Sequence, residues 1–130
     1  MTYYDKRHVA GEFEDVVART TAALSDEGFG VLSDIDVSEA FEKKLDIEYP
    51  EYRILGACNP SLAKDGLDAE RDLGVLLPCN VVIYEADDGI VVSAVDPEAM
   101  LSVVDNPEMD DIAADVRARF DRVFDTLSGR

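Results

Sequence analysis

The sequence predicts an α+β fold, in which a small and mainly antiparallel sheet has helices packed on one face. Two β-branched runs, at 77–85 and 90–95, are joined by a four-residue loop and predict a β-hairpin. The remaining predicted strands and helices lack the regular β-α-β alternation of a parallel sheet. The chain has 130 residues, 47% of them hydrophobic, which is enough for one core, so we expect a single domain over 1–130.

The first predicted helix ends at Gly28, a residue type that commonly terminates helices. Residues 29–35 follow it as a strand. The apolar face of the helix recurs at helical spacing and consists of Phe13, Val16, Val17, Thr20 and Leu24.

A short helix is predicted next, because Asp36 and Ser38 are both favoured N-cap residues. It ends near Leu45. Phe41 and Leu45 are four residues apart and are expected to be its buried pair. Pro50 closes the connection to the following strand.

Residues 51–57 alternate as a strand does, and a helix follows them directly. Asn59 is a favoured N-cap residue, and Pro60 suits the first helical position, where its missing N–H is not needed. This helix is expected to end before Gly74. A helical turn near Met100 and a last amphipathic helix over 110–127 complete the predicted elements.

The charge is strongly acidic, with 29 Asp and Glu against 12 Lys and Arg and a net charge of −17. The carboxylates are spread over every segment instead of forming a block. This pattern favours adaptation to molar salt, where a Debye length of about 3 Å screens the repulsion within the chain. The alternative interpretation is an acidic surface that recruits a basic partner.

The same charge argues against nucleic acid and anionic membranes as partners, because both require clustered Lys and Arg. No apolar run approaches the roughly 20 residues that span a bilayer. The N-terminal segment has no apolar stretch after its charges, so a secretory signal is not expected and a cytoplasmic location follows by default.

Three segments of the chain carry one pattern: Gly-Ala-Cys-Asn-Pro-Ser-Leu-Ala at 56–63, Leu-Leu-Pro-Cys-Asn-Val-Val-Ile-Tyr-Glu at 76–85 and Asp-Asp-Gly at 87–89. This pattern resembles the domain-of-unknown-function 302 family. The resemblance extends from about Phe13 to Leu127. It implies an α+β fold and gives weight to both cysteines, which belong to the motif, but it implies no settled activity.

Cys58 and Cys79 are the candidate ligand or redox residues. Cys58 ends a strand just before a helix begins, where unpaired N–H groups and the helix dipole stabilise a thiolate. Cys79 begins the next strand, so both residues are expected at the same edge of the sheet. Asn59 and Asn80 each follow a cysteine and are the candidate polar partners. The competing interpretation is that both cysteines are buried and inert, as free cysteines often are.

No complete metal site, cofactor loop or nucleophile–base pair is recognisable in the sequence. His8, the single histidine, is expected to be exposed on a first strand. A standard enzyme is therefore disfavoured, and no cofactor is expected.

Two hypotheses follow. The chain is a ligand-binding or thiol-responsive module at Cys58 and Cys79, with a small thiol, a sulfur species or a soft metal as its ligand. Alternatively, it is a non-catalytic homodimeric interaction domain in which both cysteines only pack, because an open sheet leaves an edge and an apolar patch.

Overall fold

The computed structural model describes residues 2–128 and confirms the α+β fold, with five antiparallel strands in one sheet. The strand order is β1-β5-β4-β3-β2, so β1 and β2 are the edges. The strands are β1 Tyr4–Val9, β2 Gly30–Asp36, β3 Tyr52–Cys58, β4 Cys79–Ala86 and β5 Gly89–Val95.

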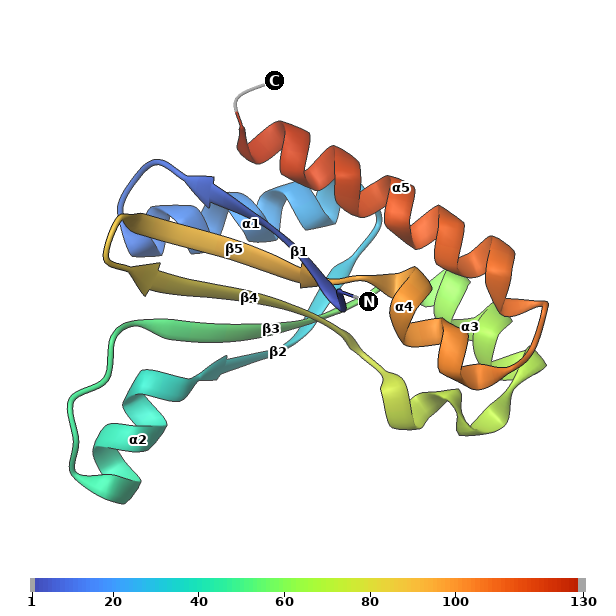
Figure 1. Ribbon diagram of the computed structural model, residues 1–130, viewed down its shortest axis with the longest axis horizontal. Coiled ribbons are helices and arrows are strands. Elements are labelled where there is room, and N and C mark those ends of the chain that lie inside the picture. The colour runs from blue at the N-terminus through green and yellow to red at the C-terminus, as the bar shows by residue number, and fades with distance from the viewer. Residues whose placement is uncertain (1, 129–130) are drawn as a thin grey trace.

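The two longest helices, α1 and α5, lie side by side across one face of the sheet (Figure 1). The smaller helices lie at its two ends: α2 projects at one end, and α3 and α4 lie at the other. The helices are α1 Phe13–Asp26, α2 Val37–Leu45, α3 Pro60–Ala69, α4 Pro97–Leu101 and α5 Met109–Leu127, with 3₁₀ segments η1 Arg71–Leu76 and η2 Ser102–Val104.

The main core lies between the sheet and the pair α1 and α5. Every second residue of the inner strands faces it, as the pleat requires, for example Val81 and Ile83 of β4. Phe29 and Phe120 pack with ring centroids 5.1 Å apart. Thr20, which the helical pattern placed on the buried face of α1, satisfies its hydroxyl by donating to the Val16 carbonyl.

The predicted helix starts are confirmed at two places. The Asp36 carboxylate accepts from the Glu39 N–H and caps α2, and the Asn59 side chain accepts from the Leu62 N–H and caps α3. Pro60 occupies the first turn of α3. Gly28 has a φ of 85°, the left-handed conformation that a glycine adopts readily after a helix.

Other expectations require correction. Phe41 and Leu45 are not a buried pair: α2 buries none of its residues, and Leu45 is 61% exposed. The hairpin loop is shorter than predicted, because Ala86 pairs with Gly89 and leaves a two-residue turn. The third helix ends at Ala69, before Gly74 as expected, and η1 occupies the stretch that follows it.

Within residues 2–128, no helix is long and apolar enough to cross a bilayer.

Candidate functional site

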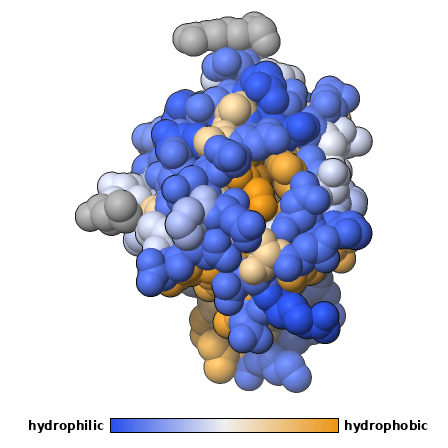
Figure 2. Space-filling view, turned by 90° about the vertical axis from the view of Figure 1, so that its right-hand side faces the viewer, coloured by the Kyte–Doolittle hydropathy of each residue, from blue (hydrophilic) through white to orange (hydrophobic). Residues whose placement is uncertain are grey.

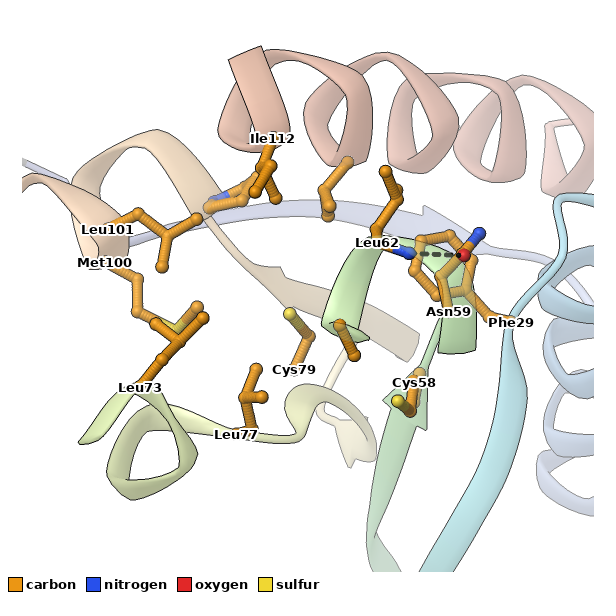
Figure 3. A pocket seen from close by; sticks show the side chains of 14 residues that line it. Phe29, Cys58, Asn59, Leu62, Leu73, Leu77, Cys79, Met100, Leu101 and Ile112 are labelled. Carbon is orange, nitrogen blue, oxygen red and sulfur yellow. Dashed lines mark hydrogen bonds between the residues drawn. The ribbon is translucent and has the colours of Figure 1, made fainter. Parts of the chain in front are cut away.

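The antiparallel register of β3 and β4 brings the two cysteines to the same end of these neighbouring inner strands. Ala57 is paired with Cys79, so Cys58 lies one residue beyond this pair, opposite Pro78. Consecutive residues of a strand point to opposite faces. Cys58 and Cys79 are therefore close along the backbone, and their sulfur atoms point in different directions (Figure 3).

Both cysteines line one small apolar hollow, which we call the cysteine pocket. Its remaining wall comes from α3, η1, α4 and α5 and includes Leu62, Leu73, Leu77, Met100, Leu101 and Ile112 (Figure 3). The pocket holds about 40 Å³ of free space. Figure 2 views the end of the molecule that carries α3 and α4, and an apolar hollow interrupts its mostly hydrophilic surface.

Close packing of α3 and η1 forms one wall of the pocket. Gly66 of α3 lies against η1, and a Cβ at this position would be only 2.6 Å from Leu73 Cδ2. Leu73 therefore fills the space that a side chain at 66 would take. Leu73 also joins Leu101, Met109 and Ala113 in a second small core beneath the pocket.

Cys79 is buried in the main core, on the face of β4 that contacts the helices. Burial raises the pKa of its thiol to about 11, and the neighbouring Cys58 adds a smaller effect in the same direction. The thiol is therefore neutral at physiological pH, and Cys79 acts as an apolar, polarisable wall of the pocket.

Cys58 is only partly buried, and it lies directly before the residue that caps α3. Asn59 lines the same pocket, but its side-chain oxygen is engaged by the Leu62 N–H at 3.2 Å (Figure 3). The Asn59 amide nitrogen lies near Gly28, where a Cβ would be 3.0 Å from it. Asn59 thus positions the strand-to-helix junction that carries Cys58.

Asn80 lies apart from the other three candidates. It is exposed and belongs to the opposite face of β4 from Cys79, the face that the helices leave open. It lines a separate groove together with Tyr52 and Tyr84. The structure therefore brings Cys58, Cys79 and Asn59 together and places Asn80 elsewhere.

Residues 2–128 contain no group of three or more His, Cys, Asp or Glu side chains arranged to hold a metal ion. His8 is exposed on β1, and its Nε2 lies 3.1 Å from Asp88 Oδ2 beside the hairpin turn. The hairpin turn and Cys79 are at opposite ends of β4. The side chains of the cysteine pocket that could bind a metal ion are those of Cys58, Cys79 and Met100, through sulfur, and the amide of Asn59.

The sequence indicated the two cysteines as site residues, but it did not indicate most of the other residues that line the pocket. Leu73 and Leu77 were expected in the tail of a helix and at the start of a strand, and they lie instead in and beside η1. Met100 was recognised only as part of a helical turn. A periodicity within one element cannot show that four separate elements converge on one hollow.

The comparisons agree with this fold. A crystal structure of an uncharacterized conserved DUF302 protein from Bacillus stearothermophilus superposes with a TM-score of 0.90 and 26% sequence identity. The match covers 96% of this chain and 98% of that one. No curated protein matches the chain. The family model described as "Domain of unknown function DUF302" matches residues 6–127. The chain therefore belongs to the DUF302 family.

Proposed function

We propose that the chain is a binding module that takes a small, soft ligand into the cysteine pocket. The observation that carries the proposal is that three sulfur-bearing side chains, Cys58, Cys79 and Met100, line one apolar hollow. Thiolate and thioether sulfurs prefer soft, polarisable partners. The proposed ligand class is therefore a small thiol, a sulfur species such as hydrosulfide, or a soft metal ion such as Cu(I).

The size of the pocket limits the ligand. A water molecule needs roughly 10–15 Å³ on this measure of free space. The cysteine pocket has about 40 Å³, so it accommodates a ligand of a few heavy atoms. Drug-sized ligands occupy pockets of about 300–1,000 Å³ and do not fit without rearrangement.

The two thiols have different roles in this proposal. Cys58 is partly exposed and is the group that an incoming ligand meets first, whereas Cys79 is buried and neutral. Because their sulfurs point in different directions, reversible binding is favoured over a disulfide between them, which needs converging Cβ atoms. Asn59 has a positioning role, because it caps the helix that begins beside Cys58.

Calorimetric titration under anaerobic conditions tests the proposal, with Cu(I), hydrosulfide and methanethiol as separate probes. We expect at least one probe to bind the wild type and to lose its binding in the Cys58→Ser, Cys79→Ser double variant with the fold intact. Met100→Leu keeps the volume and removes the third sulfur, so it should weaken Cu(I) more than methanethiol. Absence of binding by all three probes would refute the proposal.

A homodimeric interaction domain is the second candidate, and the observation that favours it is the exposed arm formed by α2 and the residues after it. Leu45, Ile47 and Tyr49 are 61%, 44% and 45% exposed. The arm follows the edge strand β2, which exposes Leu32 and Ile35. Such a surface is often covered by a second copy.

Sedimentation equilibrium distinguishes this candidate. If the arm is the interface, Ile47→Glu should shift a dimer towards monomer. Val75→Glu is the matched control, because Val75 is 85% exposed on η1, away from the arm. A monomeric wild type over the whole concentration range would exclude the dimer.

We further propose that the acidity adapts a cytoplasmic protein to a salt-rich interior. Support comes from the dispersal of the 29 carboxylates, which leaves a net charge of −17. At about 1 M salt the Debye length is about 3 Å, and the repulsion among these groups is screened. Circular dichroism should show lost ellipticity as KCl is lowered below about 0.1 M, where the Debye length exceeds 10 Å. An unchanged cooperative melt in dilute buffer would contradict this proposal.

A further inference from the structure

The face of the sheet that the helices leave open carries a groove of about 440 Å³, roughly ten times the free space of the cysteine pocket. Its floor crosses β1, β5, β4 and β3. We call it the tyrosine groove, because four of the five tyrosines of the chain line it: Tyr3, Tyr4, Tyr52 and Tyr84. Its volume falls within the range of small-molecule sites.

The four tyrosines of the groove form two pairs of interacting rings. Tyr52 and Tyr84 are direct cross-strand partners, and their rings stack at 5.5 Å between centroids with an interplanar angle of 10°. Tyr3 and Tyr4 pack edge to face at 5.1 Å. Burial raises the pKa of Tyr52, so its hydroxyl remains a hydrogen-bond donor across the physiological range. Stacked phenol rings offer a planar molecule an extended contact surface.

The tyrosine groove carries a positive charge, whereas the molecule as a whole is strongly negative. Asp and Glu make up 29 of the 130 residues, yet none of the residues that line the groove is acidic. Lys6 is its one charged lining residue, and its Nζ lies 5.7 Å from the centroid of the Tyr4 ring. Lys43 and Lys64 form ion pairs with carboxylates four residues away, whereas Lys6 forms none within residues 2–128.

The remaining polar groups are suited to orienting a ligand. Asn80 and Ser93 also line the groove, and Ser93 is the direct partner of Lys6 in the pairing of β1 with β5. An amide, a hydroxyl and an ammonium group among aromatic side chains provide donors for an oxyanion. Asn80, which lies apart from the cysteine pocket, thus belongs to the tyrosine groove.

We propose that the tyrosine groove is a second binding site, specific for a planar aromatic anion whose ring lies on the tyrosines and whose acidic group meets Lys6. The site is independent of the cysteine pocket, because it occupies the opposite face of β4. Charge complementarity selects the ligand: an anion is attracted to an acid-free, lysine-bearing hollow on a molecule whose surface is otherwise rich in carboxylates.

Two probes that share one ring system test the charge requirement. Anilinonaphthalene sulfonate carries an anionic group, and phenylnaphthylamine is its neutral counterpart. The chain has no tryptophan, and four of its five tyrosines line the groove, so most of the tyrosine emission comes from the groove. We expect the anionic probe to quench tyrosine emission and to bind more tightly than the neutral one.

Three variants give the test its controls. Lys6→Met removes the ammonium and keeps the stem, and it should weaken the anionic probe about fivefold while leaving the neutral probe unchanged. Lys44→Met makes the same charge change on exposed α2 and should affect neither probe. Tyr84→Leu should weaken both. The Cys58→Ser, Cys79→Ser variant should bind both probes as the wild type does, which separates this site from the cysteine pocket.

The proposal is overturned if Lys6→Met affects the anionic probe no more than Lys44→Met does. It is also overturned if the free protein sediments as a dimer that the probe dissociates, because the natural occupant of the groove would then be a second copy of the chain. Circular dichroism melts of every variant confirm that the fold is retained before binding is compared.

Discussion

Replacing Cys79 by Ala should change how the stability of the protein depends on pH. The Cys79 thiol is buried, and its pKa is raised from an ordinary value of 9.0 to about 11. A group whose pKa is higher in the folded state binds its proton more tightly there. Its contribution to the free energy of unfolding is complete below the pKa of the unfolded state and is lost as the pH rises through the pKa of the folded state. The wild type should therefore lose stability between about pH 9 and pH 11.

The magnitude follows from the shift in pKa. One pKa unit corresponds to about 1.4 kcal/mol, so a shift of about two units gives a total of about 2.7 kcal/mol. By about pH 10.5 the loss is about 2 kcal/mol, because the thiol is by then ionised in the unfolded chain and still mostly protonated in the folded one. Cys79→Ala removes this term and adds a pH-independent cost of about 1 kcal/mol for the small cavity.

Urea unfolding at constant KCl, with reductant present, measures both proteins at several pH values from about 7.5 to 10.5. The quantity of interest is the difference in unfolding free energy between wild type and Cys79→Ala. This difference should shrink and then reverse as the pH rises, because only the wild type loses the contribution of the Cys79 thiol. The lysine and tyrosine titrations are common to both proteins and cancel in the difference. Cys58→Ala should retain most of the wild-type slope, since burial is the larger cause of the shift. Parallel curves for wild type and Cys79→Ala would refute the reasoning.

Two further variants test the construction of the site. Gly56→Ala should destabilise the protein by about 2–3 kcal/mol in urea unfolding, because a Cβ there would lie 2.7 Å from Pro78 Cγ and would clash with Ser33 Oγ. Gly30→Ala is its control, with the nearest atom 4.0 Å away, and a loss as large as that of Gly56→Ala would show that close approach is not the cause. Asn59→Ala should cost about 1 kcal/mol by removing the cap of α3. Asn59→Asp should restore the cap, and equal losses for both would contradict the capping role.

Local chemistry made much of the fold predictable. The apolar spacing of α1, the Asn59–Pro60 start of α3 and the hairpin between β4 and β5 each depend on residues near one another in sequence, and all three are observed. The two cysteines were also expected close together, and they lie at the same end of β3 and β4, which are antiparallel neighbours.

The failures have a shared physical cause. Phe41 and Leu45 have the spacing of a buried pair, but α2 projects from the sheet, so Phe41 is only partly covered, by Tyr49, and Leu45 is exposed. The tyrosine groove depends on the lateral order of strands that are far apart in sequence, such as β1 beside β5. The alternation placed Asn80 and Tyr84 on one strand face, yet nothing local showed that Tyr4 and Lys6 would join them.

The central claim is that a small, soft ligand reaches the cysteine pocket through Cys58, and alkylation by iodoacetamide tests it most directly. Peptide mapping measures the labelling of each cysteine in the folded protein, with and without Cu(I). We predict that Cys58 is labelled while Cys79 stays blocked until unfolding, and that Cu(I) protects Cys58. If both thiols stay blocked until the protein unfolds, or if Cu(I) leaves the labelling of Cys58 unchanged, the cysteines are packing residues and the claim is wrong.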